Sequence, residues 1–148
     1  LGHPDDVKQI EVDLQSAFVS KSEGVMKEYV GNKVDVVRQS DGRAKIKVTQ
    51  PVLVQKLWDE FDLPGGRTPK TPAVPGQVLV KGDGSDALNP QDTTKYRSGT
   101  ALCMYKMQWS RPDIYNATRD CARHMSAPNE LHMKALKHLM KYVVGTAD

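Results

Sequence analysis

The first part of the chain carries apolar residues at intervals of three and four positions, the spacing that places them on one side of an α-helix. Pro4 suits the first turn of a helix, because a proline lacks the amide hydrogen that this turn leaves unbonded. The pattern predicts a helix from Pro4 to Phe18 with one buried side. That side consists of Val7, Ile10, Leu14 and Phe18.

The pattern then changes to one that is typical of β-strands. Residues 28–37 are rich in β-branched side chains, and residues 44–49 alternate between lysine and apolar positions. Ser40-Asp41-Gly42 lies between them and favours a turn, so we expect a β-hairpin. A second helix is expected over residues 51–61, where a proline again begins an apolar stripe. The stripe consists of Leu53, Val54, Leu57, Trp58 and Phe61.

Ten prolines and glycines interrupt residues 62–92, which excludes a long helix or strand there. We expect an ordered crossing followed by a flexible linker at about residues 81–86. Because domain boundaries fall in segments of this kind, we place the boundary between two subdomains here.

Three helices are expected in the last third of the chain, over residues 93–108, 112–125 and 129–144. The first has apolar residues on two sides, which is typical of a helix packed between neighbours. The second has a single stripe, and Gly145 after the third is a suitable C-terminal cap. Together with the hairpin, these helices indicate an α+β fold. The stripe of the second helix consists of Ile114, Ala117, Thr118, Cys121 and Met125.

Composition narrows the class of protein further. The 148 residues, with 39% hydrophobic and 26% charged residues, are typical of one globular domain or two small subdomains. No apolar run approaches the roughly 20 residues that cross a bilayer, and there is no pattern of a secretory signal. Cys103 and Cys121 fall on predicted helices, which favours buried reduced thiols and an intracellular setting.

The positive charge of the chain is concentrated in residues 93–148, which contain nine Lys/Arg and four Asp/Glu. Residues 1–72 are balanced, and residues 73–92 are negative. Within the last helix, Lys134, Lys137 and Lys141 share one face with His138. This face is either the solvated side of an amphipathic helix or a row of charges that follows a phosphate backbone.

The sequence contains no phosphate-binding Gly-rich loop, no nucleophile elbow and no zinc-ligand spacing. Asp5 and Asp6 are adjacent, but their position at the start of a helix favours a role at the helix terminus over metal binding. His132 falls on the apolar side of the last helix, which predicts a core histidine whose ring nitrogen bonds a backbone carbonyl or a neighbouring side chain. We therefore assign no catalytic, cofactor-binding or metal-binding residue.

Short motifs follow one another in a fixed order along the chain. In the last third they are Tyr96-Arg97-Ser98, Met104-Tyr105, Ser110-Arg111-Pro112-Asp113-Ile114, Ser126-Ala127-Pro128 with His132, and Leu139-Met140-Lys141-Tyr142-Val143-Val144-Gly145-Thr146. Upstream they are Tyr29-Val30-Gly31, Val48-Thr49-Gln50 and Thr71-Pro72. This series resembles copia-type retrotransposon reverse transcriptases, and the match covers nearly the whole chain.

Some positions depart from the family pattern. Ala101 stands where the family usually has glycine, Lys106 where it has an apolar residue, and Met133 where it has tryptophan. A lysine at an apolar helical position weakens packing unless its stem carries the ammonium group to solvent.

The resemblance implies that the parent protein is an RNA-directed DNA polymerase of a Pol polyprotein that uses two Mg²⁺ ions. It places Leu1 just after the metal-binding Tyr-x-Asp-Asp hairpin, and the ribonuclease H domain beyond Asp148. The chain would be a C-terminal palm and thumb fragment, without the catalytic aspartates and inactive alone. Residues 1–72 would be the end of the palm, with a primer-grip-like hairpin and the following helix. Residues 73–92 would be the linker and residues 93–148 a helical thumb or connection subdomain.

The same resemblance implies that this chain grips an RNA/DNA template–primer duplex, with no cofactor of its own. Its other partner would be the remainder of the Pol polyprotein (palm, fingers and ribonuclease H), and no membrane is expected. The location would be the cytoplasm, virus-like particles or the nucleus. The residues expected to contact nucleic acid are Tyr29, Gly31, Arg97, Lys134, Lys137 and Lys141.

Two other interpretations remain open at this point. The chain could be a small domesticated helical domain that binds a protein, or a non-functional relic of an element that folds poorly. A steep dependence of duplex binding on salt would favour the nucleic-acid interpretation over both.

Overall fold

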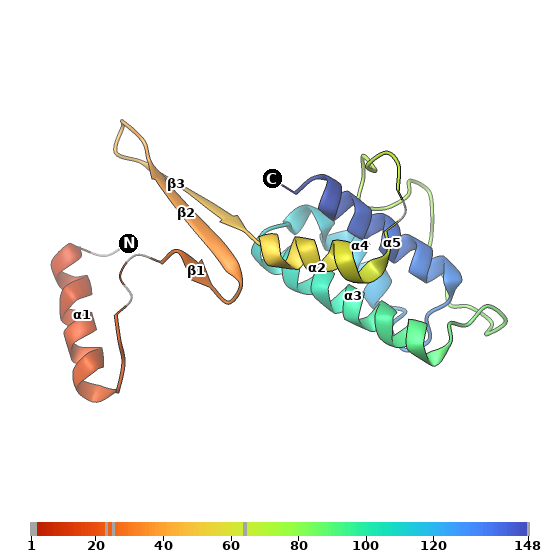
Figure 1. Ribbon diagram of the computed structural model, residues 1–148, viewed down its shortest axis with the longest axis horizontal. Coiled ribbons are helices and arrows are strands. Elements are labelled where there is room, and N and C mark those ends of the chain that lie inside the picture. Colours follow the sequence, from red (N-terminus) through yellow and green to blue (C-terminus); the bar gives the residue numbers. More distant parts are fainter. Residues whose placement is uncertain (1–2, 23, 25, 64, 148) are drawn as a thin grey trace.

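The computed structural model describes residues 3–22, 24, 26–63 and 65–147, so the expectations for Leu1 and Asp148 lie outside the described residues. The described residues form an α+β fold, as predicted, with five α-helices and one small antiparallel sheet. Figure 1 shows the helix α1 and the sheet on one side and the other helices packed together on the other side.

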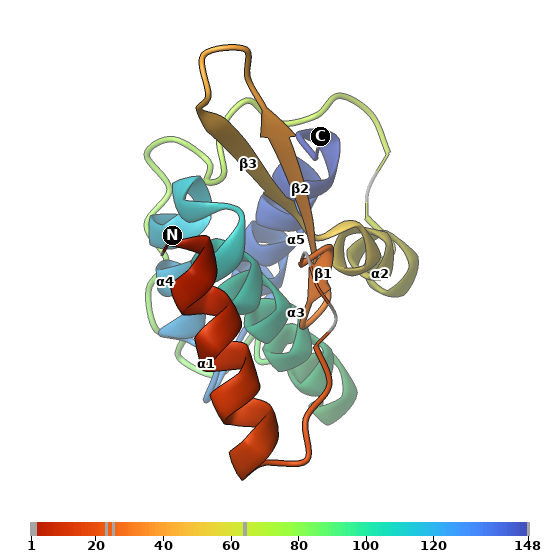
Figure 2. The ribbon, with the colours of Figure 1, turned by 90° about the vertical axis from the view of Figure 1, so that its left-hand side faces the viewer.

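Helix α1 spans Pro4–Ala17, close to the predicted bounds. Its predicted buried side is wrong, because none of its residues is buried. Val7, Ile10 and Leu14 are each more than half exposed. Figure 1 shows the helix lying clear of the helical core, and in Figure 2 it stands in front of that core. The apolar period gives the side of a helix that favours burial, but it does not provide a partner for that side.

The sheet has the order β1-β2-β3, with β1 at Glu28–Tyr29, β2 at Asn32–Arg38 and β3 at Ala44–Thr49. The predicted single strand over residues 28–37 is therefore two strands. Val30 and Gly31 form a tight turn between them, with φ values of 49° and 74°. Two successive residues with positive φ are typical of a type I′ hairpin turn, in which glycine is favoured.

Helix α2 spans Pro51–Phe61, as predicted, and buries Leu57 and Phe61. Trp58, which was expected on the same apolar side, is 54% exposed. The helix packs against both α3 (Pro90–Trp109) and α5 (Glu130–Gly145). Its buried side chains thus belong to the same core as those of the last third of the chain.

Helix α3 begins three residues earlier than predicted. The Asn89 side chain accepts a hydrogen bond from the Asp92 amide at 2.8 Å, and Pro90 occupies the first turn. This arrangement is a helix N-cap followed by proline, which stabilises the start of a helix.

The predicted helix over residues 112–125 is divided into a 3₁₀ turn, η1 (Pro112–Ile114), and a shorter helix, α4 (Tyr115–Ala122). Gly145 is still helical, and Thr146 takes the C-cap position, so the expected cap at Gly145 is wrong. A β-carbon at position 145 would collide with Thr68, so close packing explains why this residue is glycine.

The core consists of Leu57, Phe61, Tyr96, Cys103, Ile114, Ala117, Cys121, Leu136, Leu139, Met140 and Val143.

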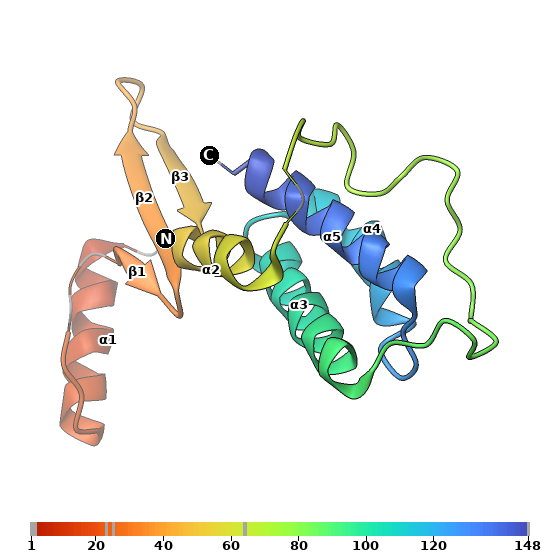
Figure 3. The same cartoon turned by 45° about the vertical axis from the view of Figure 1, so that its right-hand side comes forward.

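The segment between α2 and α3 follows the outside of the helical core, as Figure 3 shows. Its described residues form no helix or strand, apart from an isolated bridge between Ala87 and Asn129. The end of the segment is bonded to the start of α5, where the Glu130 amide donates to the Asp86 carbonyl at 3.3 Å. At its start, contacts of Lys141 with Gly65 and of His138 with Thr71 place residues 65–71 beside α5.

Candidate nucleic-acid interface

The three lysines predicted to form a stripe lie on α5, on the side opposite its buried residues. Leu136, Leu139 and Val143 are fully buried, so the predicted orientation of the helix is confirmed. A capping box fixes the start of the helix: the Asn129 side chain accepts from the His132 amide, and the His132 ring accepts from the Asn129 amide.

The stripe forms one wall of an open groove of about 630 Å³. The opposite wall comes from the segment that crosses α5 and contributes Arg67 and Lys70. No Asp or Glu occurs among the described residues that line the groove. The lining residues are Arg67, Thr68, Pro69, Lys70, Lys134, Lys137, His138 and Lys141.

Two contacts hold the crossing segment against the helix. Lys141 Nζ donates to the Gly65 carbonyl at 2.7 Å, and His138 Nε2 lies 3.1 Å from the Thr71 carbonyl oxygen. Lys141 therefore shapes the groove as well as charging it. Lys134 Nζ lies 3.9 Å from Glu130 Oε2 in an exposed ion pair. Exposed ion pairs are weak, so another anion can replace Glu130 at this lysine.

Sequence reasoning missed Arg67 and Lys70, because they lie in a Gly/Pro-rich segment that has no helical or strand period. Five Lys/Arg side chains around one groove attract a polyanion, and side chains of these two types make many of the contacts between proteins and phosphate oxygens.

Tyr29 and Gly31 do not line this groove. The Tyr29 ring packs 6.1 Å from the Trp109 ring, and Tyr105 Oη donates to the Val30 carbonyl at 2.6 Å. These contacts attach the β1–β2 turn to the end of α3. Gly31 has φ +74° with open space around it, so the turn geometry by itself explains the glycine.

Arg97 also lies away from the groove. Its Nε donates to the Met125 carbonyl at 2.7 Å, and its Nη2 donates to the Ser126 carbonyl at 3.1 Å. The guanidinium group thus ties the loop after α4 to α3. The structure brings Lys134, Lys137 and Lys141 together and places the other three candidate residues elsewhere.

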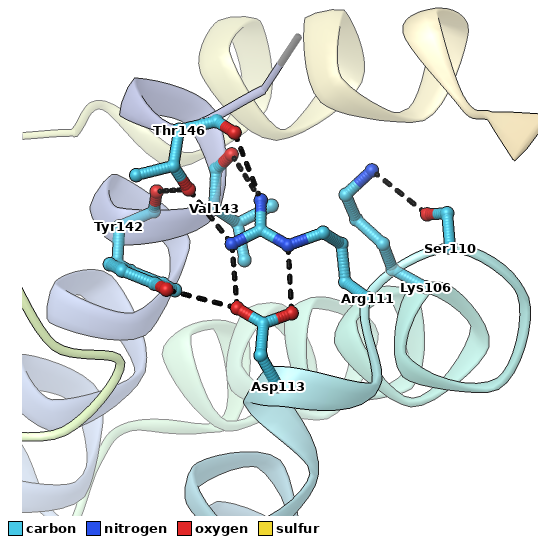
Figure 4. Close-up of polar contacts among 7 residues, drawn as sticks. All are labelled: Lys106, Ser110, Arg111, Asp113, Tyr142, Val143 and Thr146. Carbon is cyan, nitrogen blue, oxygen red and sulfur yellow. Dashed lines mark hydrogen bonds and ion pairs between the residues drawn. The ribbon is translucent and has the colours of Figure 1, made fainter. Parts of the chain in front are cut away.

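The motif at residues 110–114 forms a polar network with the end of α5, shown in Figure 4. Arg111 makes two hydrogen bonds of 2.9 Å to the Asp113 carboxylate and also donates to the Thr146 carbonyl at 3.3 Å. Tyr142 Oη donates to the same carboxylate at 2.9 Å. The Arg111 hydrogen bonds hold the pKa of Asp113 below its usual value, so this bidentate pair stays charged and joins distant parts of the chain.

His132 is a core residue, as predicted. Its ring is fully buried, Nδ1 accepts from the Asn129 amide at 3.0 Å, and Nε2 lies 2.9 Å from the Val80 carbonyl oxygen. Because a carbonyl can only accept, Nε2 carries the proton and the ring is neutral. Burial lowers the pKa of His132, and the ring stacks on His124 at a centroid distance of 4.0 Å.

The two cysteines are buried and unpaired, as predicted. Burial raises the pKa of Cys103 to about 12 and that of Cys121 to about 11. Both sulfurs are therefore protonated near neutral pH and have little nucleophilic character.

The carboxylates of the described residues do not fit the Mg²⁺ pair of a polymerase. Asp5 and Asp6 are exposed in the first turn of α1, the position predicted for them. No group of three or more His, Cys, Asp or Glu side chains in this part of the chain is arranged to hold a metal ion. Two-metal sites hold ions roughly 4 Å apart between clustered ligands, and we assign none of the described carboxylates to such a site.

Comparison with known proteins points to mobile genetic elements. The chain is 24% identical over 143 residues, 95% of its length, to the Retrovirus-related Pol polyprotein from transposon TNT 1-94 of Nicotiana tabacum. The chain is therefore similar to a transposon Pol polyprotein over almost all of its length. A second relative, the Retrovirus-related Pol polyprotein from transposon RE1 of Arabidopsis thaliana, is 33% identical over 78 residues, 53% of the chain.

The chain spans only 10% and 5% of these two polyproteins. No protein-family model matches the chain, and no solved structure matches it. Among the described residues, no helix has the length and apolar character needed to cross a membrane.

Proposed function

We propose that this chain is the duplex-gripping part of a copia-type reverse transcriptase, encoded within a retrotransposon Pol polyprotein. The groove lined by Arg67, Lys70, Lys134, Lys137 and Lys141 carries this proposal. A polymerase must hold every template–primer sequence equally well, and contacts to phosphate provide such a grip without reading bases. The similarity to transposon Pol polyproteins supports the same function.

In this proposal, the remainder of the polyprotein is the second partner. The exposed apolar side of α1 supports it, because Val7, Ile10 and Leu14 lack a covering element within the described structure. The parent polymerase would use Mg²⁺ for nucleotidyl transfer, and we assign none of its metal-binding carboxylates to this chain. The β1–β2 turn with Tyr29 and Gly31 would face the primer terminus.

An NMR titration of the chain with a short RNA/DNA duplex of arbitrary sequence tests the proposed function. We expect the backbone amides of residues 67–70 and 134–141 to shift in a saturable manner, with the same pattern for a second, unrelated duplex. Shifts confined to α1 and the hairpin, or no saturable shift at all, would overturn the groove as the duplex-binding surface.

A further inference from the structure

A second cavity, of about 340 Å³, lies where the end of β3 and the start of α2 meet the turn between α3 and η1, and Thr146 and Ala147 after α5 also line it. It shares no residue with the basic groove. Its described lining contains no Asp or Glu. Its polar wall includes Lys47, Gln50, Lys106, Ser110 and Arg111.

Lys106 is the lysine that stands where the family pattern has an apolar residue. The residue is only 3% exposed, so most of the lysine stem is buried, and the side chain lines the cavity. Its Nζ donates to Ser110 Oγ at 3.4 Å, and Figure 4 shows it pointing away from the Arg111–Asp113 pair. Burial lowers its pKa to about 8, and none of the described carboxylates forms an ion pair with it.

Gln50 provides an unpartnered donor at the same place. Its side chain is 1% exposed, and Oε1 accepts from Ser110 Oγ at 2.7 Å. Its Nε2 has no hydrogen-bond partner in the described part of the chain. A buried amide group without an acceptor costs free energy, and an oxygen atom of a bound anion would remove that cost.

The other charges around the cavity leave an excess of positive charge. Arg111 is balanced by Asp113. Lys47 on β3 lies opposite Asp35 in the sheet, but the Asp35 carboxylate is 3.3 Å from Lys33 Nζ. Lys47 and Lys106 therefore supply positive charge that the described lining does not neutralise.

We propose that this cavity binds a tetrahedral oxyanion, a phosphate or a phosphodiester group, through Lys106, Lys47 and the Gln50 amide. Ammonium and amide hydrogens are donors that suit such an anion, and partial burial strengthens their charge-assisted hydrogen bonds. The site does not depend on the function proposed for the basic groove, because the two share no residue.

The experiment is an NMR titration of the full chain with sulfate, whose charge is constant near neutral pH, at fixed ionic strength. We expect the amides of Gln50 and Ser110 to shift in a saturable manner. In Lys106→Met, saturation should require at least tenfold more sulfate, whereas Lys56→Met, which removes a charge from α2 outside the cavity, should bind like the parent.

Gln50→Glu is a second variant, which keeps the side-chain size and turns the donor into a carboxylate. It should also weaken binding, so the proposal stays testable even if Lys106→Met alters the fold. Saturable shifts of the same affinity in both cavity variants and the parent, or no saturable shift in the parent, would overturn the site.

Competition identifies the source of the anion. Displacement of sulfate by a short duplex supports a site for a nucleic-acid phosphodiester, and displacement by inorganic phosphate alone supports a site for free phosphate. Lys134→Gln/Lys137→Gln should leave sulfate binding in this cavity unchanged, which separates this test from that of the basic groove.

Discussion

His132 connects three parts of the chain through one imidazole ring. Its nitrogen atoms bond the Asn129 amide and the Val80 carbonyl, and its face stacks on His124. The bond from the Asn129 amide uses the lone pair of Nδ1, so protonation would remove the acceptor that Asn129 needs, whereas the bond from Nε2 to Val80 would remain. The ring is therefore part of the core and also closes the crossing segment onto α5.

Replacing His132 with alanine should lower the free energy of unfolding by about 1–3 kcal/mol. The change leaves a cavity beside Leu136 and removes the partners of Asn129 and Val80. Thermal unfolding would measure the loss, with exposed His3→Ala as the matched control. An unchanged melting temperature would contradict the buried position.

Whereas His132 stabilises the fold, the buried ammonium group of Lys106 lowers the free energy of unfolding near neutral pH. Its pKa is lowered to about 8 in the folded protein, below the ordinary value of 10.5. Between these two values the unfolded chain binds more protons, so folding becomes more favourable as the pH rises through this range. At lower pH, the cost of burying the ammonium group is fully present.

Lys106→Met should therefore raise the free energy of unfolding at pH 7 by about 1 kcal/mol, because solvent in the adjoining cavity screens part of the buried charge. The advantage of the variant should shrink between pH 8 and pH 10.5, as the parent loses the buried charge. Urea unfolding of both proteins at pH 7 and pH 10 would measure this difference. A constant difference between the two proteins would show that the buried amine does not titrate in this range.

At the scale of helices and strands, the sequence predicts elements best where a distinct residue begins them. Pro51 begins α2 as predicted, whereas the Asn89-Pro90 start of α3 was missed, because it follows a segment in which prolines otherwise mark irregular structure. The turn at Val30 was also missed, because β-branched residues rarely adopt positive φ. Its φ of 49° is accompanied by the hydrogen bond from Tyr105, a contact across the fold that no local pattern contains.

Helix α1 should exchange its amide hydrogens much faster than α3 and α5. It has no buried residue, and an isolated helix of this length is only marginally stable in water. Hydrogen–deuterium exchange with mass spectrometry on the whole chain would compare peptides from residues 4–17 with those from 90–109 and 130–145. Protection of α1 equal to that of α5 would mean that its apolar side is covered, for example by a second copy of the chain.

Across the full chain, both proposed binding sites are formed by contacts between segments that are distant in sequence. The lysines of α5 were predicted because one helical period relates them. Arg67 and Lys70 were not, because only the path of the crossing segment brings them to that helix. The same holds for the cavity at Lys106, whose walls come from β3, α2 and the turn after α3. A sequence pattern describes one element at a time, and both candidate sites lie between elements.

The salt dependence of duplex binding tests the basic groove most directly. When the logarithm of the affinity is plotted against the logarithm of the salt concentration, each phosphate contact contributes about −0.9 to the slope. Lys134→Gln/Lys137→Gln removes two charges while Lys141 keeps its bond to Gly65. Glutamine preserves the helix. Lys8→Gln/Lys21→Gln removes two exposed charges elsewhere and serves as the control.

If both lysines contact phosphate, the slope should be shallower by about 1.8 in the groove variant, for any duplex sequence, and unchanged in the control. Binding would be measured for the parent and both variants across a salt series, with two unrelated duplexes. Equal slopes for the parent and the groove variant would contradict the account, because the lysines of α5 would then be only a solvated helix face.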